Sequence, residues 1–198
     1  MEYIAVIDTE TNWYNEVMSI GVVVAEKATF QKVAAFYAVF DPEYRVGGMF
    51  SDVLALKGRT IKDSLCSREH AMERIIAAFK KYKITEIFAY NANFDRGLLK
   101  ELSDYRWFDI MRIAAYRQYN KKIPACTDCC RTGKMKRAYG VEPMLQLLSG
   151  DCGYREVHNA LYDAADELRI MRLLEQPLEK YTVAELKGSA EGAHDGAE

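Results

Sequence analysis

Residues 2–10 read E-Y-I-A-V-I-D-T-E, an apolar run that ends in two acids. The run from Tyr3 to Ile7 is typical of a strand that is buried on both faces in the middle of a sheet. Side chains alternate along a strand, so Asp8 and Glu10 point to the same side. Two such carboxylates repel each other unless a positive charge lies between them, and hard oxygen ligands suit Mg²⁺ or Mn²⁺. The alternative is that both acids are solvated in the following turn.

The chain as a whole has the composition of a soluble globular protein. It has 198 residues, of which 49% are hydrophobic and 28% charged, and its formal net charge is −2. This predicts one domain with a hydrophobic core and excludes a polycation that binds nucleic acid with its whole surface. No apolar stretch approaches the roughly 20 residues of a membrane span, and no signal-peptide pattern is present. Five cysteines without a secretory context predict reduced thiols in a cytoplasmic protein.

The hydrophobic pattern predicts an α/β fold. Strands are expected at 2–10, 17–25, 29–40, 84–90 and 105–108, and helices at 67–82, 94–102, 110–119, 143–148 and 160–175. Short connections favour an antiparallel meander of the first three strands. We therefore expect a mixed five-stranded sheet, three antiparallel strands and then two parallel ones, with helices on both faces. Residues 1–187 would form a single domain, and 188–198 a disordered tail with nothing to bury.

Three more groups follow at the ends of predicted elements. Asp95 lies in the first turn of a helix after the fourth strand, either beside the acids of the first strand or as a favourable charge at the helix N-terminus. His158 and Asp163 are five residues apart, about 500° of helix, so they cannot both face one site from within a helix. We expect an exposed, mobile His158 before the helix, able to act as a general base, and Asp163 one turn inside. The alternatives are a loop histidine without a function and a solvated helix acid.

These residues form three short motifs, each at a predicted strand or helix end: Asp8-Thr9-Glu10-Thr11, Asn91-x-Asn93-Phe94-Asp95 and His158-x4-Asp163-Ala164. In this order they resemble the three exonuclease motifs of the DEDDh 3′→5′ exonucleases. This is the group of the DnaQ proofreading subunit, RNase T and oligoribonuclease, which has an RNase H-like fold. The resemblance covers residues 3 to 174 and implies an RNase H-like fold for this chain.

The resemblance also implies a metal-dependent 3′→5′ exonuclease that releases nucleoside 5′-monophosphates from single-stranded DNA or RNA. Asp8, Glu10 and Asp163 would hold the metal that carries the attacking water, and Asp8 would bridge to a second metal supported by Asp95. His158 would take the proton from that water. Two Mg²⁺ or Mn²⁺ ions are expected. The alternative is a catalytically idle relative that binds nucleic acid or a polymerase, and a homodimer is left open.

Substrate contacts are expected from the first two motifs and the turn after the first strand: Thr11, Trp13, Tyr14, Asn91, Asn93 and Phe94. Many relatives have Thr-Gly-Leu in the first motif, with an apolar wedge between the terminal bases, where this chain has Thr-Asn-Trp-Tyr. Trp13 or Tyr14 could therefore stack on a base, an interaction worth about 1–3 kcal/mol. The alternatives are an aromatic pair that packs on the domain surface and a helix-capping role for Asn93.

One segment has an unusual composition. Residues 117–137 contain seven basic residues and a single acid, and could hold the phosphates of a bound strand or form a solvated loop. The same segment contains Cys126-x2-Cys129-Cys130, a zinc half-site to which Cys152 could add a ligand. A redox-active pair and simple buried or loop thiols are the alternatives.

Overall fold

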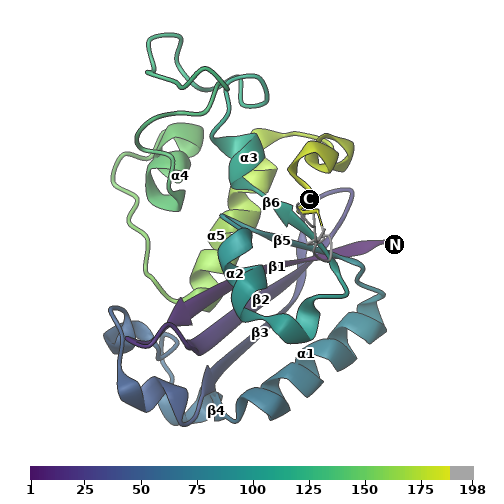
Figure 1. Ribbon diagram of the computed structural model, residues 1–198, viewed down its shortest axis with the longest axis vertical. Coiled ribbons are helices and arrows are strands. Elements are labelled where there is room, and N and C mark those ends of the chain that lie inside the picture. Colours follow the sequence, from purple (N-terminus) through teal and green to yellow (C-terminus); the bar gives the residue numbers. More distant parts are fainter. Residues whose placement is uncertain (188–198) are drawn as a thin grey trace, which may run out of the picture.

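The computed structural model describes residues 1–187, which form one sheet with helices on both of its faces (Figure 1). The strand order is β4-β3-β2-β1-β5-β6. β1 and β2 are antiparallel, as are β2 and β3, whereas the β3–β4, β1–β5 and β5–β6 pairs are parallel. The strands are Tyr3–Thr11 (β1), Val17–Glu26 (β2), Lys32–Phe40 (β3), Leu65–Cys66 (β4), Glu86–Ala89 (β5) and Arg106–Asp109 (β6). The predicted mixed sheet is confirmed, with β4 as a sixth strand.

Helices follow the strands in the order that an RNase H-like fold requires. The α-helices in residues 1–187 are Arg68–Tyr82 (α1), Asn93–Leu98 (α2), Met111–Ala114 (α3), Val141–Ser149 (α4) and Ala160–Leu174 (α5). Short 3-10 helices cover Glu43–Val46, Ser51–Val53, Ile61–Ser64, Lys100–Leu102 and Leu178–Ala184. None of the helices described here is long and apolar enough to cross a membrane. Residues 188–198, where a disordered tail is expected, lie outside the described residues.

β1 lies in the interior of the sheet and is covered on both faces, which explains its continuous apolar run. Ile4 and Val6 belong to the core that α3, α4 and α5 complete on one face. Ala5 and Ile7 belong to the core on the other face, which includes the apolar stripe of α1. Asp8 continues the side of Ile4 and Val6, so the two acids of the first motif open toward α5.

The long helices begin where the sequence places a capping residue. Ser67 caps α1, its hydroxyl oxygen accepting the N–H of His70, and Asn159 caps α5 by accepting the N–H of Leu161. Both helices thus match their predicted ranges closely. The buried stripe of α1 comprises Ala71, Met72, Ile75, Ala78 and Phe79.

Two local predictions were wrong, and one short strand was missed. Asn93 does not cap α2; it is the first helical residue, and no side chain caps this helix, which ends at Leu98. The helix predicted through residue 119 ends at Ala114. β4 has only two residues, too few for any periodicity to show. All three lie in short elements, where contacts with neighbouring elements outweigh local propensity.

Candidate active site

The carboxyl end of β1 meets the start of α5 at a point where β2 carries a glycine. Asp8 lies opposite Gly21 in the β1–β2 pair. A β-carbon on Gly21 would lie 2.1 Å from the carbonyl oxygen of Ala160 and 2.3 Å from the amide nitrogen of Leu161. Only glycine leaves room for such a close approach. The first turn of α5 is thereby seated directly beside the first motif.

Asn159 fixes this turn to the rest of the fold. Its amide donates to the carbonyl oxygen of Val53 at 2.7 Å and to the hydroxyl of Tyr37 at 3.1 Å. His158 precedes the cap, with a φ of 59° that few non-glycine residues adopt. Asp163 lies within the first helical turn, so the geometry expected from the five-residue spacing is the one observed. One ligand atom from each of Glu10, His158 and Asp163 lies within 4.8 Å of the other two.

The His158 ring does not lie free in solvent. It stacks on Phe50, with the ring centroids 4.1 Å apart and the planes 15° apart, and it is half-buried. The prediction of an exposed, mobile His158 was therefore wrong. Phe50 belongs to the glycine-containing loop after β3, where no periodic pattern identified it as part of the site. Its contact with His158 depends on the tertiary fold alone.

The second motif joins the first through a side-chain hydrogen bond. Thr9 Oγ1 donates to Asp95 Oδ1 at 2.7 Å, and Asp95 is 3% exposed. The preceding turn is held by Asp109, whose Oδ1 accepts the N–H groups of Asn91 at 2.9 Å and Met111 at 3.0 Å. Asn91 adopts a φ of 65° in this turn. The sequence indicates Asp109 only as a cap of the following helix and Thr9 only as part of the first motif, and neither was expected to hold the second motif in place.

The carboxylates of the site hold their protons unusually tightly. Burial, followed by the charge of Asp163, raises the pKa of Glu10 to about 8. Burial also raises the pKa of Asp163 to about 8, with Glu156 as the next contributor. The pKa of Asp95 rises to about 7 through burial, despite the hydrogen bond from Thr9. For Asp8, burial and then the neighbouring carboxylates, Glu167 first, place the pKa well above its usual value.

Glu167 is a further acid of this cluster. It lies one turn after Asp163 in α5, is 1% exposed, and has a strongly raised pKa through burial and then the charge of Asp95. The sequence held a signal for it, because Glu167 falls on the buried face of α5 between Ala164 and Met171. That position in an apolar stripe marks a buried acid.

No positive side chain balances these acids. Among residues 1–187, none of the ion pairs includes Asp8, Glu10, Asp95, Asp163 or Glu167. Asp163 Oδ1 and Glu167 Oε2 are buried without a hydrogen-bond partner. Buried carboxylates without a partner are costly, and clustered oxygen ligands are what Mg²⁺ and Mn²⁺ bind. The residues present therefore fit a divalent cation.

The expected substrate residues surround this cluster, and most of them are exposed. Trp13 and Tyr14 in the β1–β2 turn are 66% and 76% exposed, and Phe94 at the start of α2 is 43% exposed. Asn91 and Asn93 are exposed as well, whereas Thr11 at the end of β1 is half-buried. The exposed aromatic side chains leave ring faces free to stack.

Similarity to known proteins is found in the fold. At the level of sequence, no protein-family model and no curated protein matches this chain. The nuclease domain of 3′hExo, a DEDDh family member bound to rAMP, gives a TM-score of 0.58 and 20% identity over 86% of this chain and 90% of that one. E. coli Exonuclease I in complex with dT13 gives 0.63 and 13% identity over 92% of this chain. This is the fold of the DEDDh exonucleases.

A third structure with this fold is a 3′-exonuclease solved for its recognition of the histone mRNA stem-loop, with a TM-score of 0.60 and 19% identity over 88% of this chain. The chain spans 64% of that protein and 43% of Exonuclease I. These likenesses confirm the predicted RNase H-like, DEDDh-type fold. Within this fold the three motifs lie near one another, through the Thr9–Asp95 hydrogen bond and the proximity of Glu10, His158 and Asp163.

The basic segment lies away from this surface. Residues 115–140 extend beyond α3 and α4 at the far end of the long axis from the first turn of α5 (Figure 1). Arg117 holds the segment together by donating to the carbonyl oxygens of Ala125 and Thr127. The cysteines remain free thiols, and within residues 1–187 no set of three or more metal ligands other than Glu10, His158 and Asp163 comes together. Cys126, Cys129, Cys130 and Cys152 are thus not gathered into a set of three or more ligands in the described residues.

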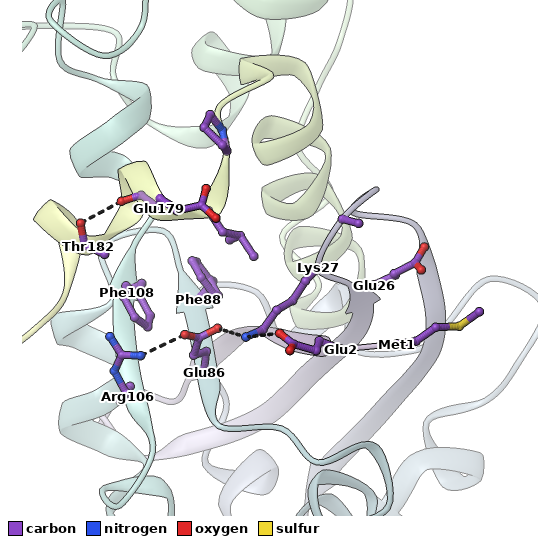
Figure 2. A pocket seen from close by; sticks show the side chains of 13 residues that line it. Met1, Glu2, Glu26, Lys27, Glu86, Phe88, Arg106, Phe108, Glu179 and Thr182 are labelled. Atoms are coloured by element: carbon purple, nitrogen blue, oxygen red, sulfur yellow. Dashed lines mark hydrogen bonds and ion pairs between the residues drawn. The ribbon is translucent and has the colours of Figure 1, made fainter.

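A pocket of about 630 Å³ opens at the opposite end of β1 and β5 in this DEDDh-type fold. Figure 2 shows Lys27 between Glu2 and Glu86, with Arg106 on the other side of Glu86. Lys27 Nζ lies 2.7 Å from Glu86 and 3.3 Å from Glu2, and Arg106 Nη1 lies 3.0 Å from Glu86. Both basic side chains of this pocket, Lys27 and Arg106, are thus held in ion pairs.

Proposed function

We propose that this protein is a metal-dependent 3′→5′ exonuclease that removes nucleoside 5′-monophosphates from the 3′ ends of single-stranded DNA or RNA. The observation that carries the proposal is the convergence of Glu10, His158 and Asp163 within 4.8 Å, beside the further unpaired acids Asp8 and Asp95. The fold supports it, since similar structures are of 3′-exonucleases.

Each side chain has a role that suits its position. Asp8, Glu10 and Asp163 would hold one cation, and Asp8 and Asp95 would hold a second. Two Mg²⁺ or Mn²⁺ ions, when bound, stabilise the entering and leaving oxygen atoms of an in-line displacement at phosphorus. His158 accepts the proton of the attacking water, since it lies beside Glu10 and Asp163 without being enclosed by them. Phe50 keeps the imidazole ring in this orientation by stacking on it.

The terminal nucleotide is held by the rim of the site, the six residues Thr11, Trp13, Tyr14, Asn91, Asn93 and Phe94. Trp13, Tyr14 and Phe94 present exposed aromatic side chains on which bases stack whatever their sequence. Thr11, Asn91 and Asn93 offer hydrogen-bonding groups to the sugar and phosphate. Solved neighbours were bound to RNA, to rAMP or to a dT13 oligonucleotide. The choice between ribose and deoxyribose depends on a contact with the 2′-OH.

The test uses single-stranded DNA and RNA of matched sequence, labelled at the 3′-terminal nucleotide, with Mg²⁺, Mn²⁺ or EDTA. We expect metal-dependent release of the labelled 5′-monophosphate, and the DNA-to-RNA ratio of rates gives the substrate class. Asp163→Ala should abolish release. Asp104→Ala is the matched control, because Asp104 is an exposed acid in the turn before β6.

Two results would contradict the proposal. Circular dichroism first establishes that the wild-type protein is folded. If the folded protein then binds single-stranded DNA or RNA but releases no nucleotide from either, the chain is a nucleic-acid-binding module. If Asp163→Ala retains the turnover of Asp104→Ala, the two-metal assignment is wrong.

A further inference from the structure

Glu167 belongs to none of the three motifs, yet it is one of the buried acids beside them. It follows Asp163 by four residues in α5, so the two side chains project from the same face of the helix. Its neighbours on that face are Ala164, Leu168 and Met171, all buried in the core beneath β1 and β2. A glutamate 1% exposed in such an apolar stripe needs a specific partner.

The fold supplies only part of this: a backbone hydrogen bond from Tyr90 favours the ionised carboxylate, and no charged partner is present among residues 1–187. Glu167 Oε2 is buried without a hydrogen bond, and no lysine or arginine of residues 1–187 pairs with the carboxylate. The charges that act on it are those of Asp95, Asp163 and Glu156, which all repel it. Glu167 in turn is the carboxylate with the largest effect on Asp8. Its charge is therefore directed at the Asp8 and Asp95 side of the cluster.

A purely structural role does not account for this arrangement. An unpartnered buried polar group costs about 1–3 kcal/mol even when it is uncharged, and a buried charge costs more. An apolar residue of similar size would fill the same space in the stripe without that cost. A bound divalent cation would make the electrostatic environment of Glu167 attractive, because it attracts all the carboxylates that otherwise repel one another.

We propose that Glu167 is a fifth carboxylate of the metal site, acting with Asp8 and Asp95 on the cation of that side, directly or through a bound water. This inference rests on the proposed function, since it assumes that the motif residues bind divalent cations. It adds to them a ligand or an ordering group that the three motifs do not contain. Glu167 would raise the affinity for the cation on the Asp8 and Asp95 side, whereas Glu10, His158 and Asp163 surround the other.

The experiment measures cation binding without turnover. Mn²⁺ is titrated into the full chain and followed by electron paramagnetic resonance and isothermal titration calorimetry, and Tm is recorded with and without Mn²⁺. The variants are Glu167→Gln, which keeps shape and removes charge, and Glu175→Gln, the same change at the exposed C-cap of the same helix. We expect Glu167→Gln to weaken one of two Mn²⁺ sites by about 10–100-fold. Its metal-free Tm should rise, because a repulsion is removed, and its Mn²⁺-induced increase in Tm should shrink.

The outcomes separate the two proposals. If the wild-type protein binds two Mn²⁺ ions and Glu167→Gln binds them as Glu175→Gln does, the role of Glu167 is wrong and the proposed function stands. If affinity falls together with the metal-free Tm, Glu167 is a structural residue and the inference is also overturned. If the wild-type protein binds no Mn²⁺, both proposals fail.

Discussion

The two ends of the central strands differ in whether basic side chains pair with their acidic side chains. At the amino end, Glu86 accepts ion pairs from Lys27 and Arg106, and Arg106 also binds Glu185 through two hydrogen bonds of 2.7 and 2.8 Å (Figure 2). At the carboxyl end, Asp8 and Glu10 face other acids, and no positive side chain among residues 1–187 pairs with them. One end satisfies its charges internally, and the other leaves them unsatisfied.

The aromatic rings follow the same division. Phe88 and Phe108 in the pocket stack on each other, with centroids 4.8 Å apart, and Arg106 covers Phe108 at 5.0 Å. Trp13 and Tyr14 beside the acidic cluster are largely exposed. A pocket whose basic side chains are already in ion pairs and whose rings already stack has little left for an anionic or aromatic ligand. The end with unpaired charges and open rings is the one built to receive a cation and a nucleotide.

The largest expected difference between the two ends is in activity. Asp8→Asn removes a charge that would hold both cations, and the loss of several kcal/mol of transition-state stabilisation corresponds to a decrease in kcat/KM of about 1,000-fold. Glu86→Gln removes a charge that pairs with Lys27 and Arg106 and should leave kcat/KM unchanged. Release of labelled nucleotide from the single-stranded substrate measures both. Equal losses in the two variants would mean that the division between the ends is not functional.

The next largest effect is expected at His158, and it distinguishes the general base from the cation ligands at the carboxyl end. His158→Ala should lower kcat by about 100-fold or more, because general-base catalysis typically contributes at least that much. Mn²⁺ affinity should change far less than in Asp163→Ala. Phe50→Leu, which removes the stacking partner of His158, should lower kcat by a smaller factor than His158→Ala. Turnover of His158→Ala at the wild-type rate would exclude this residue as the base.

The sequence predicts the parts of this fold that depend on regular patterns. The continuous apolar run of residues 3–7, the capping residue Ser67 and the apolar stripe of α1 predicted β1 and α1 closely. The motif residues were also recognisable, because three short motifs in this order at predicted strand and helix ends resemble those of the DEDDh exonucleases. These features are local, so a single sequence contains the information for them.

What the sequence did not predict depends on contacts between distant residues. Phe50 reaches His158 across more than a hundred residues, and no local pattern in its loop points to that contact. In the sequence Gly21 does not differ from other glycines in strands. Its role follows from the structure, because a β-carbon there would lie 2.1 Å from the carbonyl oxygen of Ala160 and would push α5 away. Thr9 was visible in the first motif, but its bond to Asp95 requires the position of α2. Tertiary packing supplies these parts of the site.

A smaller effect is expected from the open aromatic rim. Trp13→Ala should weaken binding of a single-stranded oligonucleotide by about tenfold, within the 1–3 kcal/mol typical of base–aromatic stacking. Phe108→Leu, at the paired end, should leave that affinity unchanged. Fluorescence anisotropy with labelled DNA and Ca²⁺ in place of Mg²⁺ measures binding. Unchanged affinity in Trp13→Ala would place this ring outside the substrate path.

The smallest effect is a pH dependence of stability that differs in sign between the two ends. In metal-free protein the pKa of Glu10 and of Asp163 is about 8, against 4.5 and 3.8 for the free side chains. Between these values the folded state holds protons that the unfolded state has released, so the free energy of unfolding falls as pH rises. Glu185 behaves oppositely, because hydrogen bonds from Arg106 lower its pKa and its contribution is lost only as pH falls below the free value.

Thermal unfolding in EDTA from about pH 5 to about pH 8 tests this difference. The metal-free protein should lose stability across this range, and Glu10→Gln should flatten the slope while Glu185→Gln leaves it unchanged. Saturating Mg²⁺ should restore stability most at the upper end of the range, because a cation that binds only the folded state stabilises it by mass action and needs the carboxylates ionised. An equal slope in Glu10→Gln, or one that Mg²⁺ does not reduce, would mean that the slope arises elsewhere in the protein. No slope in the wild-type protein would mean that the acids at the carboxyl end are balanced by the protein itself.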